Sequence, residues 1–243
     1  NYRWALNDNH SLNFLLGQEG IDYRSTGFQV TTQGQNNDRL TNLLSGTRAI
    51  SWPDSNSAYA YLSFFFRGEY NYKELYYAEV AARTDASSRF GKDHRWGMFW
   101  SLGFMWNIKN EAFLKDIEWL TNAQIKLSTG TSGNSEIPYY DHLALVAGDA
   151  NYNDEAGIYP KQSGNEELSW EQTWANNIGL TLGIFNRVNL NVDFYHKKTT
   201  NMLMLVPQSY AITGVGNRWD NIGAMMNRGV EIAMDGDVIR TCL

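Results

Sequence analysis

Hydrophobic and polar residues alternate along two neighbouring runs of this chain, between Tyr76 and Gly103. In the first run one parity is mostly apolar and the other mostly polar, which is the two-residue period of a β-strand. In the second run the apolar parity carries large side chains: Met98, Trp100, Leu102, Phe104, Trp106 and Ile108. A polar loop rich in Asp, Ser, Arg, Gly and Lys joins the two runs. We therefore predict an antiparallel hairpin with one broad apolar face.

The same alternation recurs along the rest of the chain and predicts about nine antiparallel strands in total. The other strand-like runs lie near residues 2–6, 11–17, 60–70, 123–128, 174–184, 188–195 and 229–234. The clearest run places Val188, Leu190, Val192 and Phe194 on one side, against mainly Asn and Asp on the other. The chain is thus predicted to be all-β.

The connections between these runs alternate between long and short. Long loops are expected near residues 22–57, with a short helical turn around Leu40, and near 85–95, 130–167 and 205–221; short turns are expected at 8–10, 71–73 and 185–187. The link at 109–119 is intermediate. There Asn110 is suited to cap a helix and Phe113, Leu114 and Ile117 have helical spacing, which predicts one or two helical turns from Glu111 to Trp119.

The apolar face needs a non-aqueous neighbour, which is either lipid or a second sheet. Runs of about ten residues suit a tilted strand that crosses a membrane, whereas strands of soluble proteins cluster near about five or six. Long loops on one rim and short turns on the other are typical of a bacterial outer-membrane barrel. The alternative is a soluble secreted all-β carbohydrate-binding module, in which the face with Val188 and Leu190 would pack against another sheet.

Composition narrows these classes further. The 243-residue chain has a mean hydropathy of -0.45 and 14% aromatic residues. No apolar run approaches the ~18 residues of a spanning helix, which excludes a helical membrane protein, whereas abundant Trp and Tyr suit the interfacial girdles of a barrel. The net charge of -6 argues against a nucleic-acid partner. A single cysteine, Cys242, excludes an internal disulfide framework. Because both ends lie in strand-like runs without a signal peptide, we expect a piece of a longer protein.

Several short motifs resemble a known family. Residues 83–91 read RTDASSRFG and are followed by RWG at 95–97. This resembles the R-x-D-G-S-S-R-F-G…R-W-G signature of SusC/RagA-type TonB-dependent outer-membrane transporters, with Ala86 in place of a glycine. STGTSGN at 128–134, LSWE at 168–171, FYHKKT at 194–199 and NRGVE at 227–231 continue the resemblance in the same order. Together these motifs cover at least residues 60–235.

The resemblance implies a fold and a function that composition does not. The chain, residues 1–243, would be the C-terminal part of a barrel of about 22 strands, with the plug domain and the N-terminal barrel strands absent. The whole protein would import oligosaccharides or peptides across the outer membrane of a Gram-negative cell. Its partners would be outer-membrane lipid, a SusD-like surface lipoprotein and, through the absent plug, the TonB complex.

Candidate substrate-binding residues lie in the long loops and in the hairpin predicted between Tyr76 and Gly103. Flat aromatic side chains can stack on sugar rings, and hairpin charges can contact a solute or brace a loop. These candidates are Trp52, Arg83, Asp85, Arg89, Lys92, Tyr139, Tyr140 and Trp219. A water-filled lumen would be lined by polar residues of the strands, including Glu79, Asn177, Asn189, Asn191, Asp193 and Glu231. Trp96, Trp100, Trp106, Trp174 and Tyr72 are expected in the interfacial girdles.

Other kinds of site find no support in the sequence. Residues 149–160 begin like an EF-hand, but Asp154 and Pro160 stand where that loop needs Gly and Glu. Gly214 and Gly216 lack the third glycine of a nucleotide-binding loop. The four histidines are far apart, without Cys or carboxylate partners at metal spacing, and no nucleophile has a recognisable base. We therefore expect no metal site, no cofactor and no catalytic residues, so the protein is not expected to be an enzyme.

Overall fold

The computed structural model describes residues 1–7, 9–51 and 53–237, and its main feature is one antiparallel sheet of nine strands. The strand order is β1-β2-β5-β6-β7-β8-β11-β12-β15, so each strand pairs with its predecessor in the main sheet. The nine strands are β1 (Tyr2–Asn7), β2 (His10–Phe28), β5 (Asp54–Tyr72), β6 (Tyr76–Ser87), β7 (Trp96–Asn107), β8 (Leu120–Asn134), β11 (Glu171–Ile184), β12 (Val188–Thr200) and β15 (Ala224–Gly236). The all-β, antiparallel prediction of about nine strands is confirmed.

Smaller elements lie in the connections between these strands. They are the strands β3 (Thr31–Gln33), β4 (Arg48–Ser51), β9 (Leu145–Tyr152), β10 (Glu155–Gln162), β13 (Leu203–Pro207) and β14 (Asn217–Asn221), the 3₁₀ turns η1 (Leu43–Ser45) and η2 (Ile108–Asn110), and the short helix α1 (Tyr210–Thr213). Within the described residues, no helix is both long enough and apolar enough to cross a membrane.

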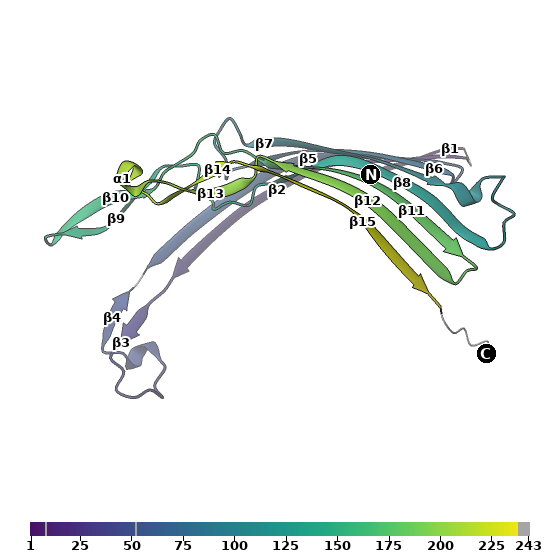
Figure 1. Cartoon of the computed structure of the whole chain (residues 1–243). Helices are drawn as coiled ribbons and strands as arrows, with labels where there is room; N and C mark the ends of the chain where they lie inside the picture. Colours follow the sequence, from purple (N-terminus) through teal and green to yellow (C-terminus); the bar gives the residue numbers. More distant parts are fainter. Residues whose placement is uncertain (8, 52, 238–243) are drawn as a thin grey trace.

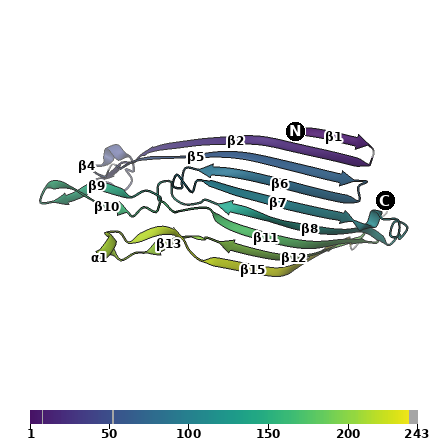
Figure 2. The same cartoon turned by 90° about the horizontal axis from the view of Figure 1, so that it is seen from above.

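Long and short connections lie at opposite ends of the curved sheet (Figure 1). The end with β3, β4, β9, β10, β13, β14 and α1 is called the long-loop rim, and the other end the short-turn rim (Figure 2). Two short-turn connections contain paired residues with positive φ, Lys73 with Glu74 and Phe185 with Asn186. Paired positive φ angles match the right-handed twist of a hairpin, which explains how these turns stay short. Asp8, in the predicted first turn, lies outside the described residues.

The two faces of the main sheet differ sharply in chemistry. Cross-strand register places Glu79, Asn177, Asn189, Asn191, Asp193 and Glu231 on one side, here called the polar face. The opposite side, called the apolar face, carries exposed large side chains: Leu16, Phe66, Val80, Met98, Leu102, Ile178, Val230, Ile232 and Met234. Met98 is 67% exposed and Met234 75% exposed. Within the described residues no second sheet packs on the apolar face, which contradicts the soluble sandwich alternative.

Strands extend further into the long-loop rim than the sequence pattern predicts. The expected loop at 22–57 narrows to residues 29–53, because β2 and β5 pair in register as far as Phe28 and Asp54. The expected loops at 130–167 and 205–221 contain the hairpins β9–β10 and β13–β14. In this region both faces of a strand contact water, so backbone hydrogen bonds persist while the alternation of hydrophobicity is lost.

The predicted helix from Glu111 to Trp119 is wrong. The 3₁₀ turn η2 ends just before this stretch, at Asn110, and the stretch itself forms hydrogen-bonded turns without a regular helix. The Glu111 carboxylate accepts hydrogen bonds from the Tyr76 hydroxyl (2.7 Å) and the Trp106 indole (3.1 Å), while Lys109 Nζ donates to three carbonyl groups, those of Leu114, Lys115 and Ile117. These bonds fix an irregular backbone in place of a regular helix.

The small hydrophobic core lies at the long-loop rim. It consists of Phe90, Phe99, Ile137, Leu168 and Trp170, and both Phe90 and Leu168 are fully buried. The Trp170 indole N–H donates to the Arg95 carbonyl at 2.8 Å. The motifs RFG at 89–91 and LSWE at 168–171 therefore meet in space and attach the long loop before β11 to the β6–β7 hairpin.

Candidate functional site

Ion pairs cross the polar face at mid-height, between β2, β5 and β6. Arg67 contacts both Glu69 (2.7 Å) and Glu79 (2.8 Å), and the Asn13 amide donates to Glu69 at 3.3 Å. All four side chains belong to the parity that faces this side. The result is a charged, hydrogen-bonded patch in the middle of the polar face.

A second group of charges lies one step nearer the long-loop rim. Arg83 pairs with Asp85 (2.6 Å) and with Glu19 (3.0 Å), and also donates to the Ser63 hydroxyl. Its guanidinium lies over the Phe65 ring, 5.6 Å from the centroid. The predicted site residues Arg83 and Asp85 are thus brought together and paired with each other. Their contact with a solute remains a prediction.

Arg89 lies at the centre of an aromatic box formed by Tyr59, Tyr61 and Tyr139. Its guanidinium carbon lies 4.8, 5.8 and 5.0 Å from the three ring centroids respectively. Its Nη1 also donates to the carbonyls of Ser135 and Ile137. The arginine therefore ties β5 to the chain segment that follows β8, and its planar faces are occupied by protein groups.

The remaining candidate residues differ in surroundings. Tyr140 is 37% exposed, and its hydroxyl accepts the Ala58 backbone N–H at 2.9 Å, while Tyr139 stacks on Tyr59. Trp219 packs on the small core rather than standing free. Lys92 is exposed in the loop that joins β6 to β7. Trp52 lies outside the described residues, so its role stays a prediction.

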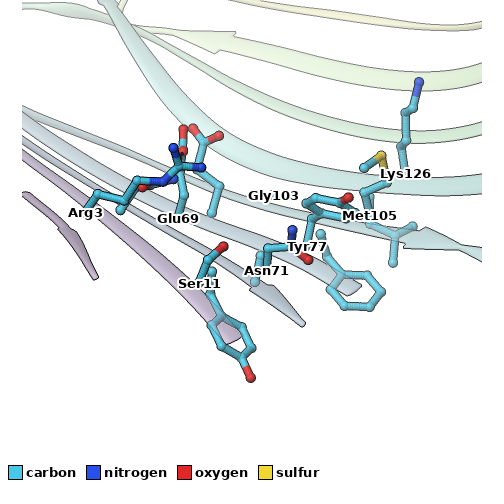
Figure 3. Close-up of a pocket in the computed structure, with 14 residues that line it drawn as sticks. Arg3, Ser11, Glu69, Asn71, Tyr77, Gly103, Met105 and Lys126 are labelled. Atoms are coloured by element: carbon cyan, nitrogen blue, oxygen red, sulfur yellow. Dashed lines mark hydrogen bonds between the residues drawn. The ribbon is translucent and has the colours of Figure 1, made fainter. Parts of the chain in front are cut away.

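A hollow of about 530 Å³ opens on the polar face near the short-turn rim (Figure 3). Six neighbouring strands contribute to its lining, and the labelled side chains include Arg3, Glu69, Asn71, Tyr77, Met105 and Lys126. The lining mixes both signs of charge with amide and aromatic groups. Such a lining suits a hydrated polar solute.

Aromatic residues also mark both ends of the apolar face. Trp96, Trp100 and Trp174 lie toward the long-loop rim, where Trp96 is 54% and Trp174 51% exposed. Tyr72, Tyr76 and Trp106 lie at the short-turn rim, where Tyr76 stacks with the other two rings. This two-ended distribution matches the girdles predicted from the sequence.

One carboxylate and one tyrosine hydroxyl of the long-loop rim have raised pKa values. Burial raises the pKa of Asp141, and the neighbouring His142 partly opposes that shift. The hydrogen bond to Asp149 raises the pKa of the Tyr159 hydroxyl. Within the described ranges, no group of three or more His, Cys, Asp or Glu side chains is arranged to hold a metal ion.

Several residues of these groups were missed from the sequence. Glu19, Arg67 and Glu69 carried a usable signal, since they share the polar parity of their strands. The signal for Tyr23 and Tyr59 was weaker, because apolar and polar residues do not alternate around them. Their rings stack at 4.9 Å only because β2 and β5 pair beyond the predicted strand ends.

Comparison with known proteins places this geometry in a family. The family described as TonB dependent receptor-like, beta-barrel matches residues 1–240. TonB-dependent receptor P39 of Formosa agariphila is 33% identical over 99% of this chain and 23% of its own length. TonB-dependent receptor SusC of Bacteroides thetaiotaomicron is 30% identical over 96% of this chain and 24% of its own length. The chain thus spans about a quarter of the length of these relatives.

Solved structures agree with the sequence relatives. The RagAB peptide importer in its closed-closed state superimposes with a TM-score of 0.89 and 36% identity, over 99% of this chain and 27% of that one. The siderophore receptor PirA of Acinetobacter baumannii, at 13% identity and a TM-score of 0.60, shares the fold alone. The chain therefore belongs to the TonB-dependent receptor β-barrel family, as one of its SusC/RagA-type members, and its nine-stranded sheet is an arc of the barrel wall.

Proposed function

We propose that this arc forms part of an active importer for oligosaccharides or peptides in the outer membrane of a Gram-negative cell. The observation that carries the proposal is the opposition of two faces. The apolar face suits lipid contact, and the polar face, with its ion pairs and its hollow, suits a hydrated passage. The function is passage of a solute and requires no bond cleavage.

The relatives support TonB-dependent import, and one of them supports the peptide class. RagAB is named a peptide importer and shares 36% identity with this chain. SusC is named a TonB-dependent receptor and shares 30% identity over a similar length. The paired name RagAB suits a second component, and we propose that in this protein it is a SusD-like lipoprotein on the long-loop rim. The TonB complex would supply energy through a plug domain of the whole protein.

Within this proposal the long-loop rim makes the first contact with the solute. Tyr23 and Tyr140 are 41% and 37% exposed, and both lie beside the aromatic box around Arg89. Such partly exposed rings offer apolar faces with polar tips to either a sugar or a peptide side chain. Arg83 and Asp85 would then line the entry to the polar wall.

Growth of the source organism tests the proposal. A strain lacking the full-length gene should lose growth on one solute class, either defined oligosaccharides or defined peptides, supplied as the carbon source. Complementation with the wild type should restore growth, and with Tyr140→Ala only partly. Tyr152→Ala is the matched control, since Tyr152 is 86% exposed on the β9–β10 hairpin. Undiminished growth of the deletion strain on both classes would refute the proposal.

A further inference from the structure

Three basic residues interrupt the apolar face near the long-loop rim. On β6, β7, β8, β11, β12 and β15, the register assigns every Asp and Glu to the polar face. In the same described strands, the Lys, Arg and His side chains that share the apolar face are His196, Lys198 and Arg228. On these six described strands the outward surface therefore carries basic residues and no acidic ones.

The three residues form one cluster. Arg228 lies directly opposite His196 on the neighbouring strand, and Lys198 is the next outward residue of β12. Directly opposed residues have Cβ atoms about 5 Å apart, a spacing at which two basic groups gain from a shared anion. Lys198 and Arg228 are exposed, and in the described structure none of the three forms an ion pair.

Polar neighbours extend the cluster across β8 and β11. Asn176 lies opposite His196, and Thr129 lies opposite Asn176. The Trp174 indole N–H donates to the Thr129 hydroxyl (3.0 Å), which donates to the Asn176 side-chain oxygen (2.7 Å). That chain of bonds leaves the Asn176 amide N–H groups as donors beside the basic residues.

The height of the cluster identifies its surroundings. Val188, Leu190, Val192 and Phe194 form an apolar band of about 20 Å along β12, at ~3.3 Å per residue. His196 follows this band toward the long-loop rim, and Lys198 lies level with Trp174, a girdle residue. Lys and Arg beside an interfacial Trp lie at headgroup depth, where they are tolerated on a barrel.

We propose that His196, Lys198 and Arg228 bind the phosphate groups of the glycolipid in the outer leaflet. The long-loop rim of such barrels faces the cell exterior, where the leaflet lipid carries phosphates on a glucosamine backbone. Arg and Lys form charge-assisted hydrogen bonds with phosphate, and the Asn176 amide adds neutral donors. The inference rests on the membrane placement of the family and is independent of the imported solute.

Lipid titration of the full-length transporter tests the proposal. Native mass spectrometry would follow binding of phosphorylated lipid A to protein in mild detergent. The double variant Lys198→Gln/Arg228→Gln should bind roughly 25-fold more weakly, from about fivefold per charge removed. The matched control is Lys126→Gln/Lys197→Gln, which removes the same charge from the polar face of β8 and β12. It should bind lipid A as the wild type does.

Two further arms separate charge from folding. The exchange Lys198→Arg/Arg228→Lys keeps both charges and should retain binding, whereas lipid A stripped of its phosphates should bind the wild type as weakly as the double variant binds intact lipid. Equal binding of lipid A by the wild type and the double variant would overturn the proposal. The proposal would also be overturned if the wild type bound phosphate-free lipid A as tightly as intact lipid A. Loss of binding in the charge-preserving exchange would overturn it too.

Discussion

At the scale of single residues, Arg89 joins two segments that are distant in the sequence. Its guanidinium faces the rings of Tyr59 and Tyr139 while its edge donates to the carbonyls of Ser135 and Ile137. Only a planar, permanently charged fork can stack and donate in this way. Arg89 therefore fastens the segment after β8 to β5, and thereby places Tyr139 and Tyr140 at the rim.

Arg89→Lys should loosen this attachment although the charge is kept. A lysine loses the stacking and one of the paired hydrogen bonds, so we expect local opening of residues 135–143 to become easier by about 2–4 kcal/mol. Hydrogen exchange of these amides in the full-length transporter measures the change. Lys92→Gln, which alters an exposed charge on the same hairpin, serves as control and should leave the exchange rates unchanged.

Asp141 gives the same segment a dependence on pH. Burial raises its pKa in the folded loop above its value in an open loop, so the folded loop favours the protonated acid. Its contribution to stability is fully present below the ordinary carboxyl pKa and is lost as pH rises through the raised value. Protection factors of residues 135–143, corrected for intrinsic exchange, should therefore fall between acidic and neutral pH.

Asp141→Asn tests that interpretation directly. An amide cannot ionise, so the fall in protection above the carboxyl range should disappear, and the loop should be better protected at neutral pH than in the wild type. Because His142 opposes the shift, the effect is smaller than burial alone would give. A variant that keeps the wild-type pH profile would show that another group titrates.

At the scale of strands, aromatic rings on the polar face lie across glycines of the same strand or a neighbouring one. Phe65 contacts the position of Gly17, Phe99 those of Gly97 and Gly133, and Tyr195 that of Gly229. A ring that covers a bare backbone restores the packing surface lost with the side chain. Glycine at these positions therefore leaves room for a flat ring.

Gly133→Val should disturb this packing. A side chain there would displace the Phe99 ring, which also packs on Trp170 in the small core, and overpacking of this kind costs about 1–3 kcal/mol. The midpoint of thermal unfolding of the full-length transporter in detergent should fall. Gly20→Val is the matched control on β2, because nothing lies within 4 Å of a side chain added there, and it should leave the midpoint unchanged or higher.

The strands of the sheet were predictable from sequence only where the two faces meet different media. The runs around Val80, Leu102 and Val192 gave correct strands because one side contacts apolar surroundings and the other water. Beyond that band β2 and β5 continue as far as Phe28 and Asp54 with polar residues on both sides. The aromatic box around Arg89 could not be predicted for the same reason, because it depends on the pairing of β2 with β5 beyond the predicted strand ends.

At the scale of the whole arc, the division of apolar and polar side chains between the two faces determines which face points outward. Val192 and Asn191 are neighbours on β12, yet they belong to opposite faces, with Leu180 beside the first and Thr181 beside the second. The same division holds from β6 to β15. If the apolar face contacts lipid, an identical substitution must have different costs at these two adjacent positions.

Val192→Arg and Asn191→Arg form the sharpest test of this arrangement. An arginine on the lipid side of a barrel near mid-membrane costs about 2–4 kcal/mol, whereas a substitution on the water-filled side mainly alters selectivity. We therefore expect Val192→Arg to lower both the unfolding midpoint in urea, measured in lipid vesicles, and the yield of full-length protein in the outer membrane. Asn191→Arg should leave both close to wild type. Equal losses for the two variants, or a larger loss for Asn191→Arg, would contradict the assignment of the faces, because the two substitutions place the same charged side chain at adjacent positions of one strand.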